Sequence, residues 1–335
     1  MTFGRRPAIL IILAFLAVSA LIIGPLIGMR TIPLDAVIHP ASWSRESEIF
    51  WRLRVPRVFV AFLGGVGLAV SGMSFQALFR NPLATPFTLG VSSGAALGAA
   101  AYIRFGLPAA LLGIPGISVS AFMGAMLSVL LVYGLTRLRS GFSTGTMLLA
   151  GVAISFFFSS VNLFIQYISD FTQTFHIIRW LMGGLEVVGF RSVLDMLPFV
   201  VVGALIILYL TNELNLMTTG EEMATSRGVN VKSVRRGIFF AASLMVGGVV
   251  SVCGPIGFVG MMSPHICRLI IGQDHRYLAP ATLLFGGAFL TICDTFARTI
   301  IAPAEIPVGV ITALLGGPFF VWLLVRGEGM DNEGL

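Results

Sequence analysis

Long apolar runs follow one another along almost the whole chain, and short polar segments separate them. A helix that spans a membrane needs about 20 mostly apolar residues. We expect ten such spans, of which the eighth is short, at residues 8–28, 57–78, 88–104, 113–136, 144–167, 192–212, 236–254, 258–272, 279–297 and 307–325. The pattern predicts an all-α polytopic membrane protein with a single transmembrane domain over residues 1–335.

The first apolar run resembles a secretory signal, because Arg5 and Arg6 precede it and Val18-Ser19-Ala20 could serve as a cleavage site. The run nevertheless continues to about Gly28, which is long enough to span. We therefore expect a retained first helix, and the even number of spans places both termini on the same side.

The composition supports a membrane protein, since 56% of the residues are hydrophobic and only 11% are charged. Soluble domains carry about 25% charged residues. The net charge of +6 would also suit a nucleic-acid-binding protein, but we interpret it as cytoplasmic loops and expect no nucleic acid. The three cysteines lie in apolar segments without the spacing of metal ligands, and we expect no bound metal.

The distribution of basic residues predicts cytoplasmic termini. With the N-terminus inside, twelve basic residues lie on the inner side and nine on the outer side. Five of those nine fall between Arg30 and Arg57, and the rest of the chain follows the positive-inside rule. Arginines kept on the outer face against this rule indicate an acidic partner there, or else a belt of snorkelling side chains.

Two polar segments are longer than a tight turn. The outer one predicts a short interfacial helix at about 172–184, with Trp180 at the level of the lipid headgroups. The inner one, at about 219–235, predicts a helix that Thr218 or Thr219 caps and Gly228 ends. Its first turn carries Glu221 and Glu222, which suit the positive end of the helix dipole. This loop is either a docking surface for another chain or an ordinary amphipathic loop.

No catalytic constellation is present in the sequence. The pair Lys232-Ser233 lacks the glycines of a phosphate-binding loop, so any ATP must be hydrolysed by another chain. Ser263-Pro264-His265 lacks a nearby carboxylate, and we interpret it as a proline-broken helix that lines a cavity. We expect that this protein is not an enzyme.

Ion coupling also has little support in the sequence. Asp294 is the only acid within a predicted span and away from its ends, and Arg298 follows it by one helical turn. We expect the two to pair. A proton-coupled secondary transporter, which usually needs buried acids, is therefore the weaker of two alternatives.

Polar and helix-breaking residues mark a candidate translocation path. Proline and glycine at membrane depth free backbone groups, which are tolerated where they face a cavity or another helix. Such residues occur around Gly254–Gly260, at Pro307–Gly309 and at Gly316-Gly317-Pro318, which we expect to interrupt the last span. A polar stripe also follows one face of the fifth span. The predicted path residues are Ser159, Asn162, Gln166, Gly254, Pro255, Gly257, Pro307 and Gly309.

The order and spacing of these motifs resemble one family over nearly the whole chain. It comprises the permease subunits of ATP-driven importers for iron–siderophore complexes, haem and vitamin B12. The matching residues are Arg54-Val55-Pro56-Arg57, Gln76, Arg80-Asn81-Pro82-Leu83-Ala84, Gly90-Val91-Ser92, Trp180 with Gly183, Gly228-Val229-Asn230-Val231, Gly254 to Gly260, Pro264-His265-Ile266-Cys267-Arg268, Asp294-Thr295-Phe296-Ala297-Arg298, Pro307-Val308-Gly309 and Gly317-Pro318-Phe319-Phe320.

The resemblance implies a set of partners and sites. It implies a homodimer in the bacterial inner membrane, two ATP-binding subunits on the inner side, a periplasmic binding protein on the outer side, and ATP as a cofactor of the partner only. It places binding-protein docking at Arg54, Arg57 and Arg298. The transported chelate would be an iron–siderophore, which we favour, or haem or cobalamin. ATPase coupling is implied for Thr219, Glu221, Glu222, Arg227, Gly228, Val229 and Asn230.

Overall fold

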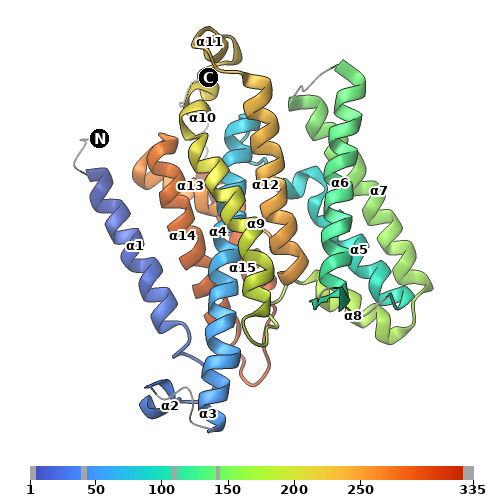
Figure 1. Cartoon of the computed structure of the whole chain (residues 1–335), viewed down its shortest axis with the longest axis vertical. Coiled ribbons are helices and arrows are strands. Elements are labelled where there is room, and N and C mark those ends of the chain that lie inside the picture. Colours follow the sequence, from blue (N-terminus) through green and yellow to red (C-terminus); the bar gives the residue numbers. More distant parts are fainter. Residues whose placement is uncertain (1–4, 39–43, 108–109, 112, 141–143, 327–335) are drawn as a thin grey trace.

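The computed structural model describes residues 5–38, 44–107, 110–111, 113–140 and 144–326. Ten helices form one bundle, in which α13 and α5 are short (Figure 1). Seven of the described helices are long and apolar enough to cross a membrane. The ten are α1 (Arg5–Ile23), α4 (Val55–Phe79), α5 (Val91–Phe105), α6 (Gly116–Ser140), α7 (Thr144–Ile168), α9 (Arg191–Tyr209), α12 (Val231–Cys253), α13 (Val259–Ile271), α14 (His275–Ala297) and α15 (Val308–Arg326). The predicted all-α membrane fold is confirmed.

Short elements cover the two ends of the bundle (Figure 1). We name these ends the α8 end and the α11 end. The α8 end carries α2 (Leu34–Ile38), α3 (Arg45–Glu48), the π-helical turn η1 (Ile49–Arg54), the antiparallel pair β1 (Ala110–Leu111) and β2 (Ile114–Pro115), and α8 (Phe171–Leu181). The α11 end carries the 3-10 turn η2 (Pro86–Leu89), α10 (Thr211–Thr218) and α11 (Glu221–Ser226). The first residues of α1 also lie at the α11 end (Figure 1).

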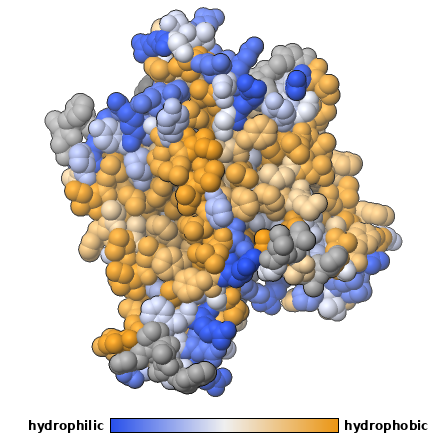
Figure 2. Space-filling view, viewed as in Figure 1, coloured by the Kyte–Doolittle hydropathy of each residue, from blue (hydrophilic) through white to orange (hydrophobic). Residues whose placement is uncertain are grey.

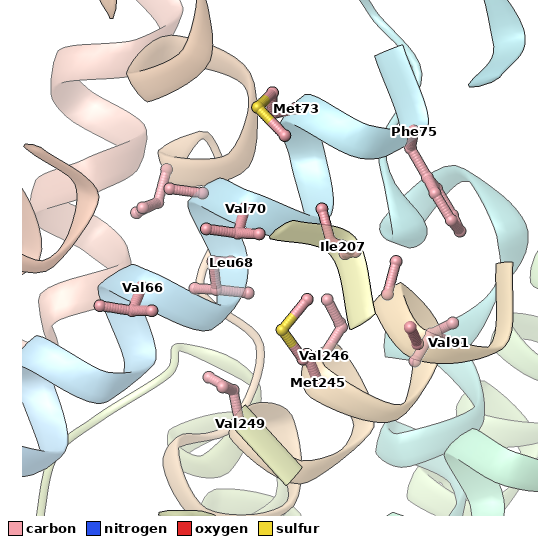
Figure 3. Close-up of a cluster of buried hydrophobic side chains, with 14 of the residues drawn as sticks. Val66, Leu68, Val70, Met73, Phe75, Val91, Ile207, Met245, Val246 and Val249 are labelled. Atoms are coloured by element: carbon pink, nitrogen blue, oxygen red, sulfur yellow. The ribbon is translucent and has the colours of Figure 1, made fainter. Parts of the chain in front are cut away.

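Helix α4 lies at the centre of the fold and packs against α9, α12, α13 and α14. Leu68, Met73 and Phe75 on α4 are almost completely buried, and Figure 3 shows them in one cluster with Met245 and Val249 of α12. Lipid tails are as apolar as these side chains, so close packing rather than exclusion of water holds such helices together. The surroundings of α4 therefore depend on the fit between neighbours.

Glycines allow α4 to approach its neighbours backbone to backbone. A Cβ atom at Gly72 would collide with the carbonyl oxygen of Gly260 in α13, and one at Gly65 would collide with that of Gly286 in α14. Small residues at helix crossings are the usual solution in membranes. Glycines therefore set the short distances at which α4 meets α13 and α14.

An apolar belt crosses the middle of the face shown in Figure 2, and polar residues gather at the two ends of the molecule. Large apolar side chains such as Phe156, Leu205 and Val321 are exposed on the helices. A contiguous apolar surface of this extent marks contact with lipid or with another chain. The belt fits the bilayer location that the sequence predicts.

Two of the expected helix breaks are not formed. Pro264 lies inside α13 and Pro318 inside α15, and both helices continue past them. The interruption expected at Gly316–Pro318 is therefore wrong. Membrane helices tolerate an internal proline where neighbouring groups satisfy the freed backbone, and Gly316 gives room for the Phe258 ring to lie against α15.

The contact between α4 and α13 gives a first prediction. Gly72→Ala should destabilise the protein by about 1–3 kcal/mol, because the added methyl group meets backbone that cannot yield like a side chain. Gly134→Ala is the matched control, since nothing lies within 4 Å of its Cβ position on α6. The measurement is the thermal midpoint in detergent, followed by size-exclusion chromatography. Equal midpoints for the two variants would contradict the close approach.

Candidate functional site

A buried carboxylate organises the α8 end. The Asp294 side chain is 1% exposed and lies near the end of α14. The Arg57 Nη2 atom lies 2.9 Å from its Oδ1 atom, and the Arg298 Nε atom lies 3.5 Å from its Oδ2 atom. The pairing of Asp294 with Arg298 is confirmed. The second arginine comes from α4 and was not foreseen, because 237 residues separate it from Asp294.

Arg57 also binds a second acid at the surface. Its Nη1 atom donates to the Glu305 Oε2 atom at 2.6 Å. The Glu305 side chain is 53% exposed, whereas that of Arg57 is 14% exposed. Glu305 was not among the site residues predicted from the sequence. Its charge, opposite to that of the outer arginines, was the one available signal.

Arg54 and Arg298 hold the segment that follows α1. Arg54 donates to the carbonyl oxygens of Pro25, Leu26 and Arg30, the last at 2.6 Å. Arg298 donates to the carbonyl oxygen of Gly24 at 2.6 Å. A helix leaves its last carbonyl groups without partners, and these guanidinium groups satisfy the carbonyls beyond α1.

The three arginines with an expected docking role therefore lie together but at different depths. Arg54 is 8% exposed and Arg298 is 6% exposed, so both lie beneath the surface. The Arg57 side chain is 14% exposed, so only a small part of it reaches the surface. Their docking role stays a prediction. Exposed arginines of this end include Arg30, Arg45 and Arg52, on or beside α2, α3 and η1, as well as Arg179 on α8 and Arg191 at the start of α9.

Three chain segments meet through their backbones near α8. Gly183 follows α8, Gly254 follows α12 and Gly309 lies in the first turn of α15. The Gly309 amide donates to the Gly183 carbonyl at 3.2 Å, and the Gly184 amide donates to the Cys253 carbonyl at 2.9 Å. Gly183 and Gly254 have φ angles of +68° and +66°, a region that disfavours side chains. We call Gly183, Gly254 and Gly309 the glycine junction.

The junction brings together part of the predicted path. Side chains at its positions would collide with backbone, such as the Pro255 carbonyl oxygen near Gly183 and the Met182 carbonyl oxygen near Gly309. Gly257 differs, because nothing lies within 4 Å of its Cβ position. The breaks expected around Gly254 and before Gly309 are present, since α12 ends at Cys253 and α15 begins at Val308.

Two cavities flank α8. The first, of about 410 Å³, is lined by Arg57, Glu305, the α8 residues Phe175 and Ile178, and Met182, which follows α8. The second, of about 530 Å³, is lined by other α8 residues, His176 and Trp180, and by parts of α9 and α12. The ion pair between Arg179 and Glu186 borders both. Helix α8 thus has open space along two of its faces.

The predicted polar stripe lies elsewhere, on α7. Ser159 is exposed, Asn162 is buried and Gln166 is half-buried. The Asn162 Oδ1 atom has no hydrogen-bond partner, and α7 packs mainly against α5, α6 and η2. Within one chain the stripe is not brought to the glycine junction, and α7 lies at the edge of the bundle (Figure 1).

The α11 end presents the predicted coupling residues to solvent. Thr219, Glu221, Glu222, Arg227, Gly228 and Asn230 are exposed, and Val229 is half-buried. Gly228 ends the turn with a φ of +85°, as expected, and Asn230 caps α12 through the Ser233 amide. The expected threonine cap is wrong. Gly220 precedes α11 with a φ of +130°, while the Thr218 and Thr219 hydroxyls donate back to carbonyls of α10.

Ion pairs tie this end to the bundle. Glu221 of α11 pairs with Arg235 of α12. Asp274 caps α14, accepts from Arg276 and Asn215, and lies 3.5 Å from Arg6 of α1. The hydrogen bonds from Arg276 and Asn215 hold the pKa of the Asp274 carboxyl well below its usual range. Helices α1, α10 and α14 therefore share one anchoring carboxylate.

The charged and polar groups described above join helices to one another. In the part of the chain that the structure describes, no group of three His, Cys, Asp or Glu residues could hold a metal ion. The Ser263 hydroxyl is buried inside α13 without a hydrogen-bond partner. Together with the apolar belt, the fold defines a polytopic membrane protein.

Comparison with known proteins specifies this class. Residues 10–326 match the FecCD transport family. The chain is 38% identical over 321 residues to the hemin transport system permease protein HmuU of Yersinia pestis, covering 95% of this chain and 94% of that protein. It is 37% identical over 297 residues to the vitamin B12 import system permease protein BtuC of Klebsiella pneumoniae, covering 87% of each.

A solved structure agrees in fold. It is described as an inward-facing conformation of a putative metal-chelate type ABC transporter, and it superposes with a TM-score of 0.86 at 31% identity, covering 96% of this chain and 99% of that one. The chain belongs to the FecCD transport family. It is a multi-pass ABC transporter permease and is not itself catalytic.

The buried carboxylate gives a second prediction. Asp294→Asn keeps the shape of the side chain but leaves Arg57 and Arg298 without their shared counter-charge, which should cost about 3–5 kcal/mol. Glu48→Gln removes an exposed acid paired with Arg52 at the same end, and should cost about 0–1 kcal/mol. Thermal midpoints of both variants in detergent test this. A similar small loss for both would show that the buried charge is not needed.

Proposed function

We propose that this chain is the permease subunit of an ATP-driven importer that moves a bulky metal chelate across the bacterial inner membrane by alternating access. Two copies would enclose one path, with two ATP-binding subunits at the α11 end and a soluble binding protein at the α8 end. The observation that carries the proposal is the exposed turn around Gly228 at the α11 end. This turn lies beyond the apolar belt, at the end of the molecule opposite to Arg54, Arg57 and Arg298.

The state of Asp294 argues against the alternative of a proton-coupled carrier. Two arginines neutralise this acid, and it is almost completely buried. A coupling acid must gain and lose its proton during transport, whereas the Asp294 carboxylate is held in ion pairs with both Arg57 and Arg298. The family membership of the chain points the same way.

A second copy would complete the path. The stripe of Ser159, Asn162 and Gln166 lies on α7 at the edge of the bundle, and exposed apolar residues such as Phe156 and Tyr167 accompany it. Polar groups are costly against lipid, whereas a partner copy would give them a cavity to face. The path would then run between α7 and the glycine junction.

The substrate class follows from the relatives. Their names specify hemin and vitamin B12, which are both metal chelates of large size. Iron–siderophore complexes, the class favoured from the sequence, belong to the same chemical group and stay our first choice.

Uptake by the reconstituted complex tests this function. Proteoliposomes that contain the permease, its ATPase and the binding protein should accumulate a labelled iron–siderophore, haem or cobalamin only when ATP is enclosed with the ATPase. A protonophore should leave the uptake unchanged. Uptake that needs a proton gradient and not ATP would establish the secondary carrier instead.

The α11 end gives a third prediction. Gly228→Val should weaken ATPase binding or uncouple hydrolysis from uptake, because a β-branched residue at a φ of +85° is strained by about 1–2 kcal/mol. Gly228→Asn is the control, since asparagine tolerates this conformation. The measurements are co-purification of the ATPase and uptake per ATP hydrolysed. Wild-type values for the valine variant would refute a coupling role.

The α7 stripe gives a fourth prediction. In a background without the native cysteines, which are all buried, cysteine at Ser159, Asn162 or Gln166 should react with a membrane-impermeant thiol reagent in at least one nucleotide state. Labelling should change when ATP is trapped on the partner, because alternating access opens one side at a time. Cysteine at Leu205, an exposed apolar position on α9, is the lipid-facing control. Absence of labelling in every state would remove α7 from the path.

A further inference from the structure

The ion pair between Arg57 and Glu305 has an arrangement that a purely structural pair would not need. One edge of the Arg57 guanidinium, Nε and Nη2, is fixed on the buried Asp294 carboxylate. The remaining Nη1 atom points outward and is covered by Glu305. Arginine offers five N–H donors in a rigid fork, and here Glu305 occupies the outward part of that fork.

The two acids around Arg57 differ in how firmly they are held. Asp294 is almost completely buried and would lose much free energy if it were left unpaired. Glu305 is about half exposed, and water can solvate its carboxylate as soon as it leaves. Exposed ion pairs contribute little. Glu305 is therefore the exchangeable acid and Asp294 the permanent one.

The surroundings provide room for another carboxylate. Arg57 and Glu305 line the cavity of about 410 Å³ that lies beside α8. A second arginine, Arg179, lines the same cavity and is paired there with the exposed Glu186. An acidic side chain that enters from the α8 end thus meets two arginines in one concave site, each held by a glutamate that solvent can reach.

We propose that Glu305 is a placeholder that occupies Arg57 until a carboxylate of the docking protein replaces it. The inference rests on the proposed function, because the partner is the acidic docking surface of the soluble binding protein. In the exchange, the Arg57 Nη1 atom releases Glu305 and accepts the incoming carboxylate, while the contact with Asp294 persists. No proton moves, and Arg57 has two acidic partners before and after the exchange.

The exchange also reaches the glycine junction. Ile306 follows Glu305 in the chain, and its amide donates to the Ala297 carbonyl at 3.0 Å. Gly309 follows three residues later. Gly309 in turn binds Gly183 at the end of α8. Release of Glu305 removes one of the contacts that hold the segment before α15, while the Ile306 amide keeps its bond to Ala297. Docking is thereby linked to the segment that joins α8 and α15.

Docking affinities of matched variants test the placeholder. The permease–ATPase complex in lipid nanodiscs is titrated with the binding protein, and dissociation constants and rates are measured at low and physiological salt. Glu305→Gln should tighten docking by about two- to fivefold, the range that a half-exposed ion pair sustains, mainly through slower dissociation. Arg57→Gln should weaken docking at least tenfold.

The Glu48→Gln variant is the control that distinguishes a placeholder role of Glu305 from a general effect of removing one negative charge. It removes one exposed acid paired with arginine at the same end but outside the cavity, and it should leave the dissociation constant unchanged. Equal tightening by both glutamine variants, or no tightening by Glu305→Gln, would overturn the proposal.

A structure of the docked complex gives a second readout. We expect a partner carboxylate within hydrogen-bond distance of Arg57 Nη1 and Glu305 turned toward solvent. Glu305 still bound to Arg57 in the docked state would overturn the inference while leaving the proposed function intact. A wild-type complex that neither docks a soluble protein nor imports with ATP would instead reject both.

Discussion

The burial of one carboxylate at the end of α14 determines how the α8 end is built. A charge in a medium of low polarity must be compensated, and Asp294 is compensated by one arginine of α4 and one of its own helix. These arginines then need further partners, which they find in Glu305 and in the carbonyl of Gly24. These successive contacts connect α1, α4, α14 and the loop before α15. Removing the central acid would leave cations, not apolar groups, in the interior.

Backbone contact is the second constraint. Around α4 it sets the distance to α13 and α14, and at the glycine junction it joins three segments that lie far apart in the sequence. Both depend on the absence of side chains. The charges fix which helices meet at the α8 end, and the glycines fix how closely they do so. A transporter that changes shape needs both kinds of contact, because the main-chain hydrogen bonds can persist while the charged side chains around them rearrange.

The fold could be predicted from the sequence because each span is a local property. Runs of about 20 apolar residues gave the positions of the ten helices, and the spacing of Asp294 and Arg298 gave their pairing. The depth of Arg54 could not be predicted, since it depends on carbonyls that lie 24 to 29 residues earlier in the chain. The contact between Arg57 and Asp294 is longer in range still. The threonine cap failed because Gly220 adopts a conformation that only glycine reaches easily. The break at Pro318 failed because a membrane helix tolerates an internal proline where it packs against neighbours, as α15 does against α14 and α13.

The glycine junction also bears on how such a permease diversifies. Its contacts are made by amide and carbonyl groups, which every residue except proline possesses, and not by side chains. Neighbouring side chains that are not fully buried, such as Met182 and Val310, could therefore change in size or polarity without altering these backbone contacts. Any preference for cargo that such side chains provide would be encoded by atoms other than those of the junction. A lineage could adapt its passage to a chelate of another shape by substitutions beside the junction while the moving framework stays the same.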